Sequence, residues 1–362
     1  MDKKQRLTGI DLLRSLAIYA VVILHSDEGI LVKPMGWTAI LQFSSFAVPF
    51  FLATSFYLII NKLYVSGSQF PWKLRLTRLL IPYGFWSLAY LLQKSIKYLS
   101  KHEIDKLIHL FQDPVSLIFF GGSAFHLYFL PLLLSGTVLI KTVEFLIKRN
   151  FKLTTLILGL LVSTFIYEIL LVTGNSFQIG TSIAFQNLVA NTIPSANQNP
   201  ILRLFLGELA LIIRCLPYIF MAMVLNHHSI SKKLLYFRSF STVVLGFIFV
   251  TLNIYGYLFI PEALDEVVRG YTTLLFAISL STNLKENGIV ANLGSCSFGI
   301  YLLHLLLVEV FQSLGNKFYA ITKIPVSTLT LLTTSILIFL LSWVATYLLM
   351  KKKSVAKFMF GV

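Results

Sequence analysis

Long apolar segments recur along the whole of this 362-residue chain, with short polar segments between them. A helix that crosses a bilayer needs about 20 mostly apolar residues, because the hydrocarbon core is about 30 Å thick and each helical residue rises about 1.5 Å. The sequence therefore predicts an all-α, polytopic membrane bundle of about ten transmembrane helices. We expect these spans at residues 9–29, 39–61, 76–96, 126–147, 153–173, 205–225, 241–260, 267–282, 294–313 and 326–349.

The composition excludes a soluble globular domain. Hydrophobic residues make up 56% of the chain and charged residues 12%, whereas soluble domains contain about 45–50% and about 25%. The net charge of +15 does not indicate nucleic-acid binding, because the basic residues lie in short runs between apolar segments. The two cysteines, Cys215 and Cys296, lie inside apolar segments and predict no disulfide framework.

The distribution of Lys and Arg predicts that both termini are cytoplasmic. The outer segment 94–113 departs from the pattern because it mixes basic and acidic residues, which indicates an amphipathic helix at the membrane interface. The outer segment 174–202 carries no charge and is rich in Asn, Gln, Ser and Thr, so carbohydrate contact, packing and disorder all stay open for it. The predicted inner loops contain Lys62, Lys73, Arg75, Arg78, Lys148, Arg149, Lys152, Lys232, Lys233, Arg238, Lys285, Lys351, Lys352, Lys353 and Lys357.

Ionisable side chains inside membrane spans are costly, so they mark candidate functional sites. Arg14 and His25 are eleven residues apart in the first span. At about 100° per residue they share one helix face, roughly 16 Å apart along the axis. An equally weighted alternative is that Arg14 reaches the inner headgroups and His25 is an interfacial residue.

Arg75 and Arg78 are three residues apart at the predicted cytoplasmic end of the third span, and Pro82 follows one turn later. Two guanidinium groups offer planar paired donors that suit a multiply charged anion such as a phosphate or pyrophosphate. Simple flanking of a span by basic residues explains the pair equally well. Pro82 is expected to bend this helix.

Gly121 and Gly122 are expected to allow a tight backbone approach just before His126 and Tyr128, at the outer start of the fourth span. A capping or aromatic-belt role for His126 and Tyr128 is slightly favoured over a functional one.

Tyr301 and His304 share a helix face late in the chain, with Gly299 permitting close packing. A lone histidine in such a position is more often a hydrogen-bonded helix partner than a catalyst. Isolated charges inside other spans are expected to pair within the bundle, with partners that the sequence does not identify: Glu168, Glu208, Arg214, Arg269 and Glu309.

In this order, the segments resemble the acyltransferase 3 family of bacterial membrane acyltransferases, whose members modify surface polysaccharides, peptidoglycan, lipid-linked sugars and small molecules. The family's pattern of an Arg, ten residues and a His falls on Arg14 and His25. Its R-x-x-R motif falls on Arg75 and Arg78 and is followed by IPY. Its FF-x-x-S-G-F pattern resembles PFFLATSFYLI, in which the glycine is missing.

The resemblance continues to the end of the chain. The W-F-L-type segment falls on HLYFLPLLL, with Tyr128 where Trp is usual, and the S-[FY]-G-I-Y-L-x-H pattern falls on Ser297 to His304. Some branches place a Glu shortly after the fourth-span aromatic residue, where this chain has Leu and Pro, so no role for that Glu is carried over.

The resemblance implies one acyltransferase 3-like transmembrane domain over residues 1–362, without a soluble C-terminal domain, in the bacterial cytoplasmic membrane. The implied activity moves an acyl group, acetyl being the expected one, from cytoplasmic acyl-CoA to a hydroxyl of a cell-surface or lipid-linked carbohydrate, with no metal. His25 is the expected general base, with Arg14 also catalytic. Arg14, Arg75 and Arg78 are expected to bind the donor, and the secondary candidates are His126, Tyr128, Tyr301 and His304.

An exporter or flippase of a polysaccharide or its lipid-linked intermediate is the main alternative, since it would use the same polar residues as a path. Three features favour the enzyme: the pair Arg75 and Arg78, the alignment of Arg14 and His25 on one helix face, and the lack of an internal inverted repeat. A scaffold among other polysaccharide-assembly proteins is a third alternative, and it predicts no CoA binding. Membrane lipids and a carbohydrate acceptor are the expected partners, and nucleic acid is not.

Overall fold

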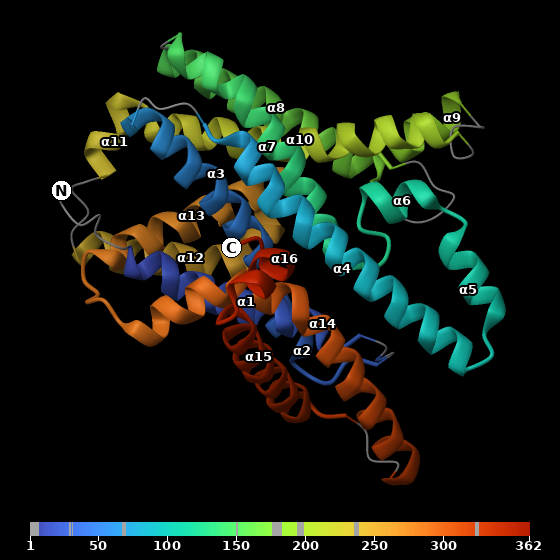
Figure 1. Cartoon of the computed structure of the whole chain (residues 1–362). Helices are drawn as coiled ribbons and strands as arrows, with labels where there is room; N and C mark the ends of the chain where they lie inside the picture. Colours follow the sequence, from blue (N-terminus) through green and yellow to red (C-terminus); the bar gives the residue numbers. More distant parts are fainter. Residues whose placement is uncertain are drawn as a thin grey trace. The chain divides into compact units, whose positions relative to one another are not determined.

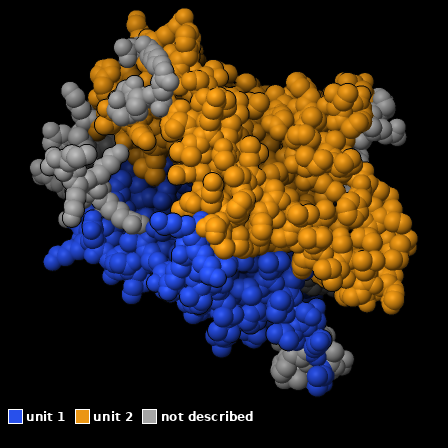
Figure 2. Space-filling view, in the orientation of Figure 1, with its two compact units in different colours: residues 1–54, 232–261, 265–353 blue, residues 55–231, 262–264, 354–362 orange. Residues whose placement is uncertain are grey.

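The computed structural model describes residues 7–28, 30, 32–66, 70–149, 151–175, 183–193, 199–234, 239–322 and 326–362. These residues form helices and connecting turns, and no strand occurs among them (Figure 1). The predicted all-α class is therefore confirmed. The chain divides into two compact units, coloured in Figure 2: unit 1 contains residues 1–54, 232–261 and 265–353, and unit 2 contains residues 55–231, 262–264 and 354–362.

Eight helical segments in the described part of the chain are long and apolar enough to cross a membrane, so the chain is a multi-pass membrane protein. The expected spans 76–96 and 267–282 also form helices but are not among the eight. The number ten and the cytoplasmic termini stay predictions. The eight segments are Thr8–His25, Trp37–Val65, Phe125–Ile147, Leu153–Thr173, Pro200–Asn226, Ser241–Phe259, Gly288–Lys317 and Thr328–Met350.

The expected span 39–61 is divided into two helices, α2 (Trp37–Ser44) and α3 (Ala47–Ser66), by a turn at Ser45 and Phe46. Pro49 explains the break. A proline has no amide hydrogen to donate to the carbonyl four residues earlier, which here is that of Ser45, and its ring crowds the same carbonyl. The first span is also shorter than expected, because the helix ends at His25.

Unit 1 is organised around α1 (Thr8–His25), most of whose residues are buried. This helix packs against α2, α14 (Gly288–Thr322) and α15 (Thr328–Met350). Two glycines permit the closest approaches: a Cβ on Gly294 of α14 would lie 2.7 Å from the carboxylate of Asp11, and one on Gly9 would meet the Ala277 carbonyl. Unit 1 also contains α12 (Ser239–Phe259) and most of α13 (Glu262–Ser281).

Unit 2 is built on α10 (Pro200–Asn226), which packs against α7 (Phe129–Lys148) and α8 (Leu153–Thr173). Helix α4 (Trp72–Ser100) packs on α7 and continues through Pro82 without ending. The chain terminus returns to α4 as α16 (Lys353–Phe360): the indole of Trp86 donates a hydrogen bond of 2.8 Å to the Met359 carbonyl. The remaining described elements are α5 (Ile104–Phe111), α6 (Pro114–Phe119), the 3-10 helix η1 (Phe125–Tyr128), α9 (Gln186–Thr192) and α11 (His228–Leu234).

The segment expected to form an amphipathic helix does so, as α5 (Ile104–Phe111). Its exposed apolar side chains Ile104, Ile108 and Phe111 recur at the spacing of one helix face, and none of its residues is buried. Its place at a membrane interface stays a prediction. The expected carbohydrate contact of segment 174–202 also stays a prediction, since residues 176–182 and 194–198 lie outside the described residues, as does Arg238.

Candidate functional site

The structure brings two predicted histidines of unit 1 together. His25 is the last residue of α1, and its ring centroid lies 5.4 Å from that of His304 on α14. The side chain of His25 is 20% exposed, whereas His304 is fully buried. Tyr301, one turn before His304, places its ring 6.2 Å away. Spacing within each segment predicted the helix faces, and the packing of α1 on α14 joins them.

A main-chain contact decides how the ring of His304 is held. Its Nδ1 atom lies 2.6 Å from the carbonyl oxygen of Tyr301. A carbonyl oxygen only accepts hydrogen bonds, so Nδ1 donates, and the neutral ring then keeps its lone pair on Nε2. This contact agrees with the expectation that His304 is a hydrogen-bonded partner between helices. It also gives the ring a defined orientation toward His25.

Sequence reasoning missed an acidic residue beside His25. Glu28 lies in the turn after α1, and its Oε1 is 3.0 Å from Nδ1 of His25. The side chain of Glu28 is 31% exposed, so the pair is partly shielded from solvent. The signal available in the sequence was the separation of three residues, which brings side chains together at a helix end.

Arg14 lies eleven residues before His25 on the same unbroken helix and is half-buried. One turn earlier, Asp11 is buried against Gly294 of α14, and its carbonyl accepts a hydrogen bond of 2.8 Å from the Ser15 hydroxyl. The continuous helix preserves the separation of roughly 16 Å along its axis. The catalytic and donor-binding roles of Arg14 stay predictions.

In unit 2, Arg75 joins two of the motifs on which the resemblance was based. Its Nη2 donates a hydrogen bond of 2.6 Å to the hydroxyl of Ser55, in the segment PFFLATSFYLI, and its Nε donates one of 3.2 Å to Thr137 on α7. Thr137 is fully buried, so Arg75 reaches into the bundle. Arg78 is exposed, and its carbonyl lies against Gly361 of the terminal segment. The two arginines thus have different surroundings.

The expected tight backbone approach before His126 is confirmed. Gly121 has a φ of +73°, and a Cβ there would lie 2.6 Å from the amide nitrogen of Tyr128. A Cβ on Gly122 would lie 2.6 Å from the hydroxyl oxygen of Ser116. The amide of Gly121 also donates a hydrogen bond of 2.9 Å to the hydroxyl oxygen of Tyr83 on α4. The loop therefore holds η1 close to α4 and α6.

His126 is buried in this loop region, and its ring centroid lies 5.1 Å from that of Tyr90, edge to face. Tyr128 is half-buried, and the guanidinium carbon of Arg214 lies 5.9 Å from its ring centroid. Both side chains pack against α4 or α10, and Tyr128, the N-cap residue of α7, makes no side-chain capping hydrogen bond. Their functional roles stay predictions.

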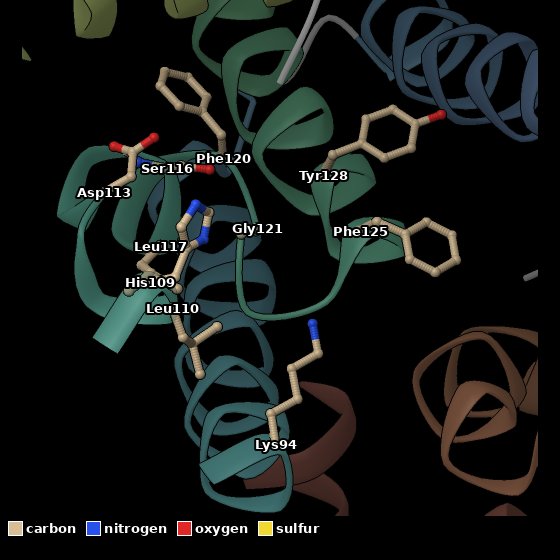
Figure 3. Close-up of a pocket in the computed structure, with 11 residues that line it drawn as sticks. Lys94, His109, Leu110, Asp113, Ser116, Leu117, Phe120, Gly121, Phe125 and Tyr128 are labelled. Carbon is tan, nitrogen blue, oxygen red and sulfur yellow. Dashed lines mark hydrogen bonds between the residues drawn. The ribbon is translucent and has the colours of Figure 1, made fainter. Parts of the chain in front are cut away.

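A cavity of about 690 Å³ opens beside this loop, between α4, α5 and α6 (Figure 3). Figure 3 shows Lys94 extending from α4 toward the loop, with Phe125 and Tyr128 on the far side. His109 and Asp113 line the opposite wall. A mostly apolar lining with a few polar groups is a common property of ligand sites.

A buried ion pair fixes one wall of this cavity. The carboxylate of Asp113 accepts a bond of 2.6 Å from Nη2 of Arg203, and its other oxygen accepts the amide of Ser116, 3.1 Å away, at the start of α6. Asp113 and Arg203 are 3% and 6% exposed. The pair therefore ties α6 to α10 and is a structural element of unit 2.

The structure identifies contacts for four of the isolated charges. Each contact is made with a residue on another element or one turn away, which the sequence alone does not reveal. Glu168 accepts the amide of Ala263, Glu208 accepts the hydroxyl of Ser135, Arg269 bonds Asp265 and Ser45, and Arg214 faces Tyr128.

The predicted residues belong to two separate sets. Arg14, His25, Tyr301 and His304 lie in unit 1, whereas Arg75, Arg78, His126 and Tyr128 lie in unit 2. Their action in one reaction stays a prediction. In the part of the chain that the structure describes, no three His, Cys, Asp or Glu side chains are grouped so that they could hold a metal ion.

Comparison with known proteins identifies one family. A family model described as an acyltransferase domain matches residues 7–350. No curated protein and no solved structure matches the chain. The matched range contains all the segments that carry the resemblance, from Arg14 to His304.

Proposed function

The chain belongs to the acyltransferase 3 family and is a membrane acyltransferase, and from this premise we propose that it is an O-acetyltransferase of the bacterial cytoplasmic membrane. It moves an acetyl group from cytoplasmic acetyl-CoA to a hydroxyl of a cell-surface or lipid-linked carbohydrate. The observation that carries the proposal is the pairing of His25 with His304 at the end of α1, the central helix of unit 1.

His25 acts as the general base. Its imidazole removes the proton of the acceptor hydroxyl while that oxygen attacks the carbonyl carbon of the thioester. The new C–O bond forms, the C–S bond breaks, and the proton passes from His25 to the departing CoA sulfur. General-base assistance of this kind accelerates a reaction about 10²- to 10⁴-fold.

His304 supports this chemistry from the neighbouring helix. Its Nδ1 bond to the Tyr301 carbonyl fixes the ring, so Nε2 has one orientation. In this role His304 accepts a hydrogen bond from the acceptor and helps to align its hydroxyl. His126 and Tyr128 are further candidates for contacts with the acceptor, since Tyr128 lines the cavity of unit 2 and His126 lies in the same 3-10 helix.

Arginine side chains bind the donor. The guanidinium of Arg75 is oriented by the hydroxyls of Ser55 and Thr137, and an oriented guanidinium suits the phosphates of CoA. Arg78 and Arg14 are the other donor-binding residues. The pantetheine arm, roughly 15–20 Å long as an extended chain, matches the roughly 16 Å between Arg14 and His25 along α1.

Two measurements test the proposal. Acetyl-CoA should raise the thermal unfolding temperature of the detergent-solubilised protein, because a ligand that binds the folded state stabilises it by mass action. Arg75→Lys and Arg78→Ala should reduce this shift, while Lys106→Ala, which removes an exposed amine paired with Glu103 on α5, should not. Absence of a shift in the wild-type protein would favour the exporter.

The second measurement is the acetylation of surface glycans by mass spectrometry. In a deletion strain, the wild-type gene should restore acetyl esters and His25→Ala should not. Membrane insertion is checked by the amount of protein in the membrane fraction. Normal acetylation with His25→Ala would refute the mechanism.

A further inference from the structure

The turn that follows α1 brings a carboxylate back toward His25. The amide of Ser26 donates to the carbonyl of Ile23, 3.0 Å away, and the amide of Glu28 donates to the carbonyl of His25, 3.5 Å away. This tight turn places Oε1 of Glu28 at an ion-pair distance of 3.0 Å from Nδ1 of His25, without the alignment of a hydrogen bond. The contact is therefore built into the end of the helix.

The neighbouring acidic residue makes a different contact. Asp27 is buried, and its Oδ2 lies 3.2 Å from the amine of Lys33, farther along the same connection. Of these two adjacent carboxylates, Glu28 faces His25 and Asp27 faces Lys33. The chain thus offers a matched comparison between two acidic residues of one turn.

Apolar packing holds the turn on both sides. Ile23, before the turn, belongs to a cluster of buried residues with Trp37 and Leu331, and Ile30, after the turn, packs against that cluster. Trp37 is fully buried. Because Ile23 and Ile30 anchor the chain on either side of this turn, the backbone that carries Glu28 is restricted before any substrate binds.

A second contact restricts His25. The ring of His304 lies 5.4 Å from that of His25, and its own Nδ1 is held by the carbonyl of Tyr301. His25 therefore contacts both a fixed ring and a carboxylate of the adjoining turn, and its Nδ1 is the atom that lies 3.0 Å from the carboxylate.

We infer that Glu28 is a positioning residue for His25, an inference that rests on the proposed function. A small rotation of the Glu28 side chain from the 3.0 Å contact lets the carboxylate accept the Nδ1 proton of His25, so that the neutral ring keeps its lone pair on Nε2 for the acceptor hydroxyl. It also stabilises the positive charge that His25 carries between removal of the proton and its return to the CoA sulfur. Glu28 does not itself touch the reacting atoms.

Kinetics of four single variants and one double variant test this inference. The single variants are Glu28→Gln, Glu28→Asp, Asp27→Asn and His25→Ala. Transfer of radiolabelled acetyl groups from acetyl-CoA is measured into the glycans of membranes from the deletion strain, at several acetyl-CoA concentrations. Glu28→Gln should lower kcat about 10- to 10³-fold, which is less than the about 10²- to 10⁴-fold of general-base catalysis because Glu28 acts only through His25. The KM for acetyl-CoA should change less than about twofold, because the interaction matters in the transition state. Glu28→Asp should recover part of the lost kcat, since it keeps the charge.

Two comparisons separate positioning from a structural role. Asp27→Asn should keep a kcat close to the wild-type value. The double variant His25→Ala/Glu28→Gln should be no slower than His25→Ala, because a residue that acts through His25 has no effect once His25 is gone. Additive losses, equal losses in the Asp27 and Glu28 variants, or a Glu28→Gln effect confined to KM would each overturn the inference.

The outcome also distinguishes this inference from the proposed function. An inactive His25→Ala with a fully active Glu28→Gln leaves the proposed function intact and refutes the role of Glu28. An active His25→Ala refutes the proposed function itself. Folding of each variant is checked by its thermal unfolding temperature with and without acetyl-CoA, and Glu28→Asp supplies a second measurement of the role should Glu28→Gln fail to fold.

Discussion

Replacement of Gly121 by alanine is the sharpest test of the loop that precedes His126. Gly121 has a φ of +73°, and a side chain in this left-handed conformation costs about 1–2 kcal/mol. The added Cβ would lie 2.6 Å from the amide nitrogen of Tyr128 and 2.7 Å from the carbonyl carbon of Leu127. Both are backbone atoms that cannot rotate away, so overpacking adds roughly 1–3 kcal/mol. The expected loss of folding free energy is therefore roughly 2–5 kcal/mol.

Gly84→Ala is the matched control, because the same substitution is made at an exposed position inside α4 where a Cβ meets nothing within 4 Å. There alanine should stabilise the helix by about 0.5–1 kcal/mol. Unfolding of the two purified variants by heat and by denaturant, in one detergent, measures the difference. A Gly121→Ala protein as stable as the wild type or as Gly84→Ala would refute the close approach of the loop to η1.

Three further substitutions probe contacts that the structure shows. Asp113→Asn should destabilise unit 2 by about 3–5 kcal/mol in the same unfolding assay, because it leaves the charge of Arg203 buried; no loss would contradict the buried ion pair. Gly294→Ala should cost about 1–3 kcal/mol, because its Cβ would meet α1 closer than 3.0 Å, and a neutral effect would show that the helices are farther apart. Ser55→Ala should weaken acetyl-CoA stabilisation several-fold by releasing Arg75, and unchanged binding would argue against that hydrogen bond as a determinant of donor binding.

Most of the fold was predictable because it depends on apolar length. Every expected span is represented by helix, since a segment of about 20 apolar residues has few alternatives in a bilayer. The errors lie where one residue changes local geometry. Pro49 divides the expected second span into α2 and α3, and the first helix ends at His25, four residues early. The mean hydropathy of a segment does not reveal such interruptions, because one proline or turn residue changes it very little.

The site was predictable in its residue types and less so in its contacts. Periodicity placed Arg14 and His25 on one face, and glycine spacing predicted the approach at Gly121, which the structure confirms. The contact between His25 and His304 joins residues 279 positions apart, and it arises from the packing of α1 on α14. A single sequence contains no signal for such a pairing. The contact between Glu28 and His25, by contrast, could have been predicted from their separation of three residues.

The location of α1 bears on the two interpretations of His25. An interfacial histidine would be expected on a helix that exposes much of its surface, as α12 and α15 do. In their apolar stretches 17% and 22% of the residues are buried, whereas in α1 the share is 67%. The ring of His25 instead faces the fully buried His304. A polar side chain at such a place requires partners that offset its loss of hydration. The partner that Glu28 provides is a carboxylate, and this chemistry favours a histidine that gains and loses a proton over one that only anchors the helix at the membrane surface.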